Sequence, residues 1–84
     1  MAYVYLLLCG DGSYYAGWTN DLDKRVKQHA AGKGSRYTRA HLPVCLAYAE
    51  RFADKQAAMQ REWRLKRCNH AEKQQLAMNW DGKY

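Results

Sequence analysis

Residues 3–19 read YVYLLLCGDGSYYAGWT, and this stretch decides the fold. Residues 2–9 are apolar, aromatic and β-branched, which predicts a mostly buried strand. The run Gly10-Asp11-Gly12-Ser13 is a strong turn signal, and residues 14–19 have the composition of a second strand. The stretch therefore predicts a β-hairpin.

A helix is predicted directly after the hairpin. We expect Asn20 to cap it, with Asp23 as a weak capping-box partner. Its apolar stripe would consist of Leu22, Val26 and Ala30. Gly32 is expected to end it.

The second half of the chain predicts one more strand and two more helices. Residues 32–43 are expected to form a loop, and residues 44–52 a third strand. Asp54 would cap a helix that runs to about Cys68, and Asn69 with Glu72 would cap a short helix through Met78. The tail from residue 80 to 84 either frays or folds back through its aromatic side chains. The order ββαβαα predicts a small α/β (α+β) domain, with a three-stranded, mainly antiparallel sheet flanked by helices.

Length and cysteine content limit the class of protein. The 84 residues suit one domain over residues 1–84, with a core at about 3–67 and a C-terminal helix and tail at 69–84. The three cysteines are far apart and form no C-x-x-C pair, which favours reduced thiols in a cytoplasmic protein over a disulfide framework or a zinc site. Residues 3–9 are too few to cross a membrane, so no membrane partner is expected.

The net charge of +6 is concentrated in one part of the chain. No Asp or Glu occurs between residues 24 and 49, whereas the rest of the chain carries eight basic and eight acidic residues. A concentrated basic patch suits a polyanion, although a solvated basic face has the same composition. The six cations of this segment are Lys24, Arg25, Lys27, Lys33, Arg36 and Arg39.

Five side chains suit chemistry at a phosphate: Tyr5, Tyr15, Arg25, His29 and Glu62. Arg25 and His29 are four residues apart, so they share one face of the first helix at the edge of its apolar stripe. Arg25 at the rim of the core and His29 at the surface are the ordinary alternatives. Tyr5 and Tyr15 lie on the paired strands, where a phenol often only packs in the core. Gly17 in the second strand indicates the close approach of another group.

Glu62 lies on the apolar side of the second long helix, on the same face as Ala58 and Leu65. An unpaired carboxylate costs several kcal/mol in such a place, so it must pair with a cation or bind a metal. An ion pair with Lys66, one turn away, is the alternative and contributes about 0.3–0.5 kcal/mol at a surface.

Taken in order, these residues resemble the motifs of the GIY-YIG nuclease superfamily, in particular its small stand-alone bacterial branch. Residues 3–5 (Tyr-Val-Tyr) stand where the first motif triplet occurs, with Tyr3 in place of its glycine, and residues 15–17 (Tyr-Ala-Gly) stand where the second occurs. Residues 19–29 match the helix that carries the arginine and the histidine of the family. Residues 61–66 match the helix that carries its glutamate.

The resemblance implies a metal-dependent DNA endonuclease. Glu62 would hold Mg²⁺ or Mn²⁺, and Arg25 would donate to the scissile phosphate. Tyr5 would act as the general base toward water, with Tyr15 at the same phosphate or water, and His29 would relay or orient the proton. A phenol has an ordinary pKa of about 10, so it needs help from nearby cations to act as a base at neutral pH. The products would carry a 5′ phosphate and a 3′ hydroxyl.

The acid-free segment is expected to hold the nucleic acid. Its flexible, cationic and aromatic residues suit a phosphate backbone with stacked, unpaired bases, which favours single-stranded or branched DNA over duplex. RNA is not excluded. A non-catalytic binding module and a nuclease subunit that needs a protein partner are the alternatives. The residues expected to bind the nucleic acid are Lys24, Lys33, Arg36, Tyr37, Arg39 and Lys66.

Overall fold

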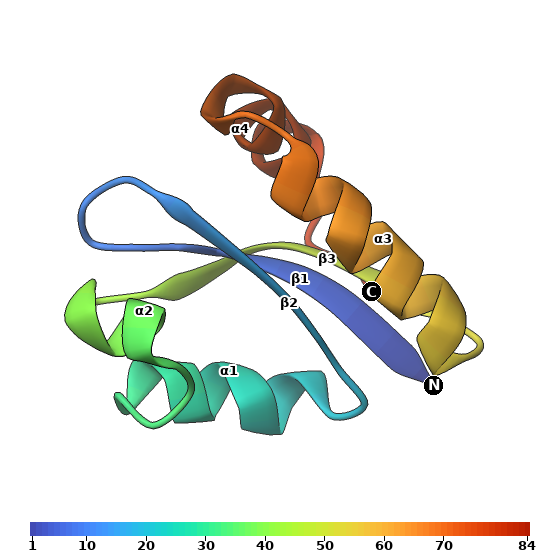
Figure 1. Ribbon diagram of the computed structural model, residues 1–84, viewed down its shortest axis with the longest axis horizontal. Helices are drawn as coiled ribbons and strands as arrows, with labels where there is room; N and C mark the ends of the chain where they lie inside the picture. The colour runs from blue at the N-terminus through green and yellow to red at the C-terminus, as the bar shows by residue number, and fades with distance from the viewer.

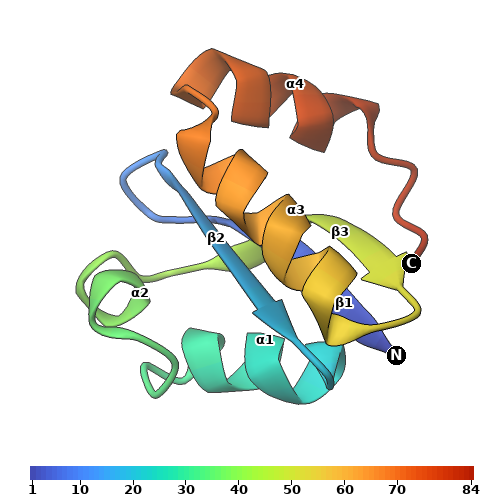
Figure 2. The same cartoon turned by 45° about the vertical axis from the view of Figure 1, so that its right-hand side comes forward.

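The computed structural model describes residues 1–84 and has three strands and four helices. The sheet contains β1 (Ala2–Leu8), β2 (Tyr14–Thr19) and β3 (Cys45–Phe52) in the order β2-β1-β3, and both pairings are antiparallel. Helices α1 (Leu22–Ala30) and α2 (Arg36–Ala40) lie on one side of the sheet. Helices α3 (Lys55–Arg67) and α4 (His70–Asn79) lie on the other side, as both ribbon views show (Figures 1 and 2). The predicted fold class is therefore confirmed.

The hairpin forms as the sequence predicts. The turn closes through a hydrogen bond from the Cys9 N–H to the Ser13 carbonyl at 2.8 Å. Gly12 has a φ of 86°, a left-handed conformation that only glycine adopts without strain. Because side chains alternate along a strand, β1 contributes to two cores, one under each pair of helices. Val4 and Leu6 pack with α3, whereas Leu7 packs with α1.

The start of α1 differs from the prediction by one residue. Asp21, not Asn20, is the cap, and its carboxylate accepts from the Lys24 N–H. The Thr19 hydroxyl accepts from the Asp21 N–H at 3.1 Å and so holds Asp21 in place, and a negative charge is favourable at a helix N-terminus. Asp23 is not a capping partner, because its carboxylate accepts from the Tyr84 hydroxyl at 3.0 Å.

The apolar stripe of α1 was also predicted partly wrongly. Ala30 is exposed, whereas His29 is completely buried. Leu22, Val26 and His29 follow the i, i+4, i+7 spacing of a buried helix face, and this places the imidazole against the sheet.

The predicted loop at residues 32–43 contains the short helix α2. The side chain of Ser35 caps it by accepting from the Thr38 N–H. The prediction missed α2 because five residues show no helical periodicity; buried Thr38 and the cap hold it instead.

The C-terminal part of the chain packs back on the sheet. Asp54 caps α3, and Asn69 and Glu72 form a full capping box at α4, as predicted. The tail folds back, with Trp80 against Tyr48 and the ring of Tyr84 6.0 Å from that of Tyr3. All three cysteines are free thiols. No helix has the length and apolar character needed to cross a membrane.

Candidate active site

The centre of the site is the phenol of Tyr5, which is 1% exposed. Tyr5 lies opposite Gly17 of the edge strand β2, and its ring leans across that residue. A Cβ at position 17 would lie 2.5 Å from the Tyr5 hydroxyl oxygen. Only glycine leaves room for the phenol, which confirms the predicted close approach at Gly17.

A buried chain of hydrogen bonds runs from the Tyr5 hydroxyl to α2. The hydroxyl oxygen lies 2.8 Å from Nε2 of His29, and Nδ1 of His29 lies 2.8 Å from Oγ1 of Thr38. His29 and Thr38 are both 0% exposed, so His29 is not the surface residue that the alternative interpretation expected. A Cβ at Gly34 would lie 2.1 Å from Nδ1 of His29, so this second glycine allows the loop to close over the imidazole.

Thr38 has two further polar partners, both on Ser35. Oγ1 of Thr38 lies 3.0 Å from Oγ of Ser35 and 3.3 Å from the carbonyl oxygen of Ser35, which can only accept. In the tautomer in which the threonine hydroxyl donates to that carbonyl, the Thr38 oxygen accepts from Nδ1–H of His29. In the same tautomer the unprotonated Nε2 faces the Tyr5 hydroxyl as an acceptor.

The phenol and the imidazole form a neutral pair in the resting state. Burial lowers the pKa of His29 from 6.5 to about 4, with a smaller effect from the charge of Arg25, so the imidazole is neutral at pH 7. Burial raises the pKa of Tyr5 above its ordinary value, and the Arg25 guanidinium opposes this rise. The phenol is therefore protonated in the resting state, and the guanidinium alone does not make it a phenolate.

Arg25 is held beside the phenol by two polar contacts. Its guanidinium donates to the side-chain oxygen of Gln28 at 3.2 Å and to the carbonyl oxygen of Gly34 at 3.4 Å. The side chain is half-buried, and it forms no ion pair with a carboxylate. Its remaining N–H groups are available to an anion, as a phosphate-binding role requires.

Tyr15 lies on the same side of the sheet and is the innermost ring of an aromatic stack. Its ring centroid is 5.3 Å from that of His29 and 5.9 Å from that of Tyr37. Tyr37 is also stacked against His41 at 4.2 Å, and its hydroxyl donates to Ser13 at 2.6 Å. Tyr37 is 39% exposed, so its ring supports Tyr15 and is also partly open to solvent.

Glu62 lies on α3, in the helical layer on the other side of the sheet from α1. It lies between buried Ala58 and Leu65, and its side chain is 21% exposed. Burial is the main cause of the raised pKa of Tyr5, and the charge of Glu62 adds a small further rise. Lys66 lies 3.8 Å from the carboxylate and is 56% exposed, which makes this ion pair weak.

The predicted nucleic-acid-binding residues fall into two groups. Lys24 and Lys33 line one hollow of about 530 Å³, and Lys33 also lines a neighbouring one of about 340 Å³ with Arg36 and Arg39. The second hollow contains no carboxylate, whereas Asp21 and Asp23 also line the first. Arg25 is joined to the second hollow through Gly34, whose carbonyl oxygen accepts from its guanidinium. Lys24, Lys33, Arg36 and Arg39 together are called the basic surface. Lys66 is on the opposite helical layer, next to Glu62, and is not part of that surface.

Sequence reasoning missed Thr38 and Ser35. The Ser-x-x-Thr spacing that ends in a buried hydroxyl is a weak signal, and it was hidden among the basic residues of the predicted loop.

Comparison with known proteins identifies the family. The GIY-YIG catalytic domain family matches residues 1–75 of the chain. The chain belongs to the GIY-YIG family. This membership supports a nuclease-type function on DNA, and domains of the family generally use divalent metal ions.

Its relatives include small bacterial and archaeal proteins. The chain is 53% identical over 73 residues to a UPF0213 protein of Bacillus velezensis, and the aligned region covers 87% of the chain and 74% of that protein. It is 46% identical over 76 residues to a UPF0213 protein of Halobacterium salinarum, and the aligned region covers 90% of the chain and 99% of that protein. The solution NMR structure of a UPF0213 protein from Bacillus halodurans has the same fold, with a TM-score of 0.61, 44% identity and coverage of 100% of the chain and 90% of that protein.

Proposed function

We propose that this GIY-YIG protein is a metal-dependent endonuclease that hydrolyses phosphodiester bonds in DNA, with a preference for single-stranded or branched substrates. The observation that carries the proposal is the buried phenol of Tyr5, which is hydrogen-bonded to His29 and whose pKa responds to the charges of Arg25 and Glu62. A phenol that only packs in a core needs one hydrogen-bond partner; it does not need a guanidinium in addition to a buried imidazole.

The hydrogen-bond chain supports a proton route for hydrolysis. As the oxygen of a water molecule attacks phosphorus, its proton passes to the Tyr5 oxygen, and the Tyr5 proton passes to Nε2 of His29. The bond from phosphorus to the 3′ oxygen breaks, and the 3′ oxygen takes a proton from solvent, which leaves a 5′ phosphate and a 3′ hydroxyl. Burial is the main cause of the low pKa of His29, and a phosphate paired with Arg25 would offset the smaller effect of the Arg25 charge.

Glu62 fits a divalent metal ion. Its carboxylate supplies a hard oxygen ligand near the phenol, and its only cationic partner is the exposed Lys66. No group of three or more His, Cys, Asp and Glu side chains gathers around it, so water and phosphate oxygens would complete the shell, as is usual for Mg²⁺. A Mg²⁺ or Mn²⁺ ion held there would supply Lewis-acid stabilisation of the charge on the phosphate.

The basic surface supports DNA as the substrate. Lys24, Lys33, Arg36 and Arg39 line two neighbouring hollows, and clustered cations attract a phosphate backbone whatever its sequence. Tyr15 would contact the same phosphate or the attacking water. The alternative, a binding module without catalysis, keeps this surface but has no use for the buried hydrogen bond between Tyr5 and His29.

The test is a cleavage assay with labelled single-stranded, branched and duplex DNA, in Mn²⁺ or in excess chelator. Wild type should cut only with metal, and Glu62→Ala should cut nothing while its DNA affinity stays within about twofold. Asp81→Asn, which removes an exposed carboxylate from the tail, is the matched control and should cut like wild type. Equal cutting by wild type and Glu62→Ala would refute the metal role. No cutting of any substrate by wild type would favour the binding module.

A further inference from the structure

The outward flank of α3 carries an exposed indole. Trp63 is 60% exposed and Met59 is 45% exposed, and they lie one helical turn apart on the same side of the helix. A hollow of about 430 Å³ lies beside them, lined by Met59, Gln60, Trp63 and Arg64. Since a large aromatic side chain gains most from burial, an indole exposed beside a hollow marks a place where a ligand or partner binds.

One side of this indole is already occupied by a cation. The guanidinium carbon of Arg67 lies 4.7 Å from the ring centroid of Trp63. Arg67 is one turn after Trp63, whereas Met59 and Gln60 are one turn before it, so the guanidinium and the hollow flank the indole along the helix axis. The cation–π contact orients the ring and leaves its hollow side open to a flat, apolar group.

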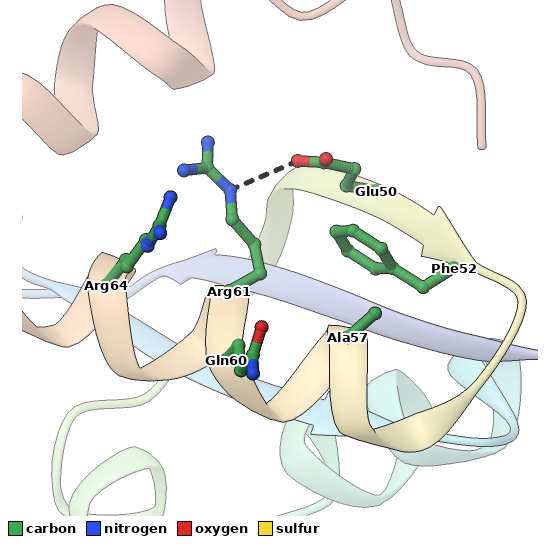
Figure 3. Close-up of a pocket in the computed structure, with 6 residues that line it drawn as sticks. All are labelled: Glu50, Phe52, Ala57, Gln60, Arg61 and Arg64. Carbon is green, nitrogen blue, oxygen red and sulfur yellow. Dashed lines mark hydrogen bonds and ion pairs between the residues drawn. The ribbon is translucent and has the colours of Figure 1, made fainter.

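Arg64 borders both this hollow and a second one of about 340 Å³ (Figure 3). In the second hollow, Nε of Arg61 donates to the Glu50 carboxylate at 3.2 Å. The guanidinium of Arg64 extends in the same direction as that of Arg61 but has no ion pair and no side-chain hydrogen bond (Figure 3). A free guanidinium next to a stacking surface is suited to a phosphate that follows a base along a strand.

The charges on α3 favour a nucleic acid over a protein as the occupant. Residues 61–67 carry four cations and one carboxylate, and that carboxylate, Glu62, faces Lys66. The lining of the hollow beside Trp63 contains no Asp or Glu. A partner that presents both negative charge and flat apolar faces matches this surface, and a strand with unpaired bases has both.

We propose that the α3 flank formed by Met59, Gln60, Trp63, Arg64 and Arg67 binds single-stranded nucleic acid, with an unpaired base stacked on Trp63 and a phosphate on Arg64. The inference rests on the proposed nuclease function and names the form of substrate that the site takes. Trp63 and Glu62 are neighbours on α3 but lie on different faces of it, so the stacked base would belong to a part of the strand that runs along the outer side of the helix. Duplex DNA cannot use this surface, because its bases are already stacked on one another.

The test measures binding in excess chelator, so that no cleavage occurs. A fluorescein-labelled oligothymidine is titrated with each variant, and fluorescence anisotropy gives the dissociation constant. Trp63→Ala should weaken binding about 5- to 100-fold, whereas Trp63→Phe should keep most of the affinity. Met78→Ala removes an equally exposed apolar side chain from α4 and should have no effect. Arg64→Ala should lower the slope of log K against log salt by about 1, and Lys83→Ala, in the tail, should not.

An abasic strand of the same length and a duplex are the controls for stacking. On both of them Trp63→Ala should bind like wild type. Unchanged binding of oligothymidine by Trp63→Ala would overturn the proposal and leave the exposed indole to a protein partner. An equal loss on the abasic strand would also overturn it.

These outcomes are separate from those of the cleavage test. If wild type cuts no DNA but binding of oligothymidine depends on Trp63, the nuclease function fails and the binding surface stands. If wild type cuts DNA and Trp63→Ala binds unchanged, the reverse holds. Circular dichroism should show the same melting temperature for Trp63→Ala as for wild type within about 3 °C, since the side chain is mostly exposed.

Discussion

Replacement of Thr38 by valine tests the direction of the proton route. Valine has nearly the shape of threonine, so the change removes Oγ1 and leaves the packing of this fully buried position in place. Nδ1 of His29 then loses its partner at 2.8 Å. In the tautomer that the proton route requires, Nδ1–H then either stays unpaired or its proton moves to Nε2, so that the imidazole donates to Tyr5. In the second case His29 no longer accepts the Tyr5 proton.

The size of the effect follows from the burial of the group. An unsatisfied buried donor costs about 1–3 kcal/mol. In a domain of this length each kcal/mol lowers the melting temperature by about 4–8 °C. The loss of a positioned proton acceptor reduces the rate of the chemical step by about 10²–10⁴-fold. The KM should change little, because Thr38 is buried and does not contact the substrate.

Thr38→Ser is the matched control, because it keeps the hydroxyl and loses only the methyl group. The measurements are single-turnover cleavage, thermal unfolding, and the nitrogen chemical shifts of the His29 ring, which distinguish the two tautomers. Thr38→Ser should cleave within about threefold of wild type and keep the Nδ1–H tautomer. If Thr38→Val and Thr38→Ser have equal kcat values, the proton route through His29 and Thr38 is wrong.

Two further predictions concern pH and salt. Because burial lowers the pKa of His29 from 6.5 to about 4, the unfolded state binds a proton in this range that the folded state does not. The free energy of unfolding should be at its full value above pH 6.5 and fall by about 3 kcal/mol as the pH is lowered to 4. Urea unfolding of His29→Gln should show a flatter dependence of this free energy on pH. Equal pH profiles for the two proteins would contradict the burial of a neutral imidazole. Lys33→Ala and Arg39→Ala should each lower the salt slope of DNA binding by about 1 and leave single-turnover cleavage at saturating DNA unchanged. A loss of turnover at saturation would instead place the basic loop in the active site.

Local patterns in the sequence were sufficient for most of the fold. The hairpin, the cap of α3 at Asp54 and the capping box of Asn69 and Glu72 depend on residues a few positions apart, so their signals are contained in short segments. The cap of α1 was less predictable, because Asp21 competes with the neighbouring Asn20. The cap of α2 was missed together with its helix, because five residues show no helical periodicity.

The sequence by itself determined the family, and it predicts the candidate site residues through their resemblance to the family motifs. These residues are Tyr5, Tyr15, Arg25, His29 and Glu62. Only the tertiary structure decided how they relate. It buried His29 completely, joined it to Thr38 on a helix that periodicity does not reveal, and stacked Tyr37 against its own neighbours. It also left Trp63 in solvent beside Arg64. The physical reason is that burial and hydrogen-bond direction depend on groups far apart in the chain, and no local pattern records which of them meet across a sheet.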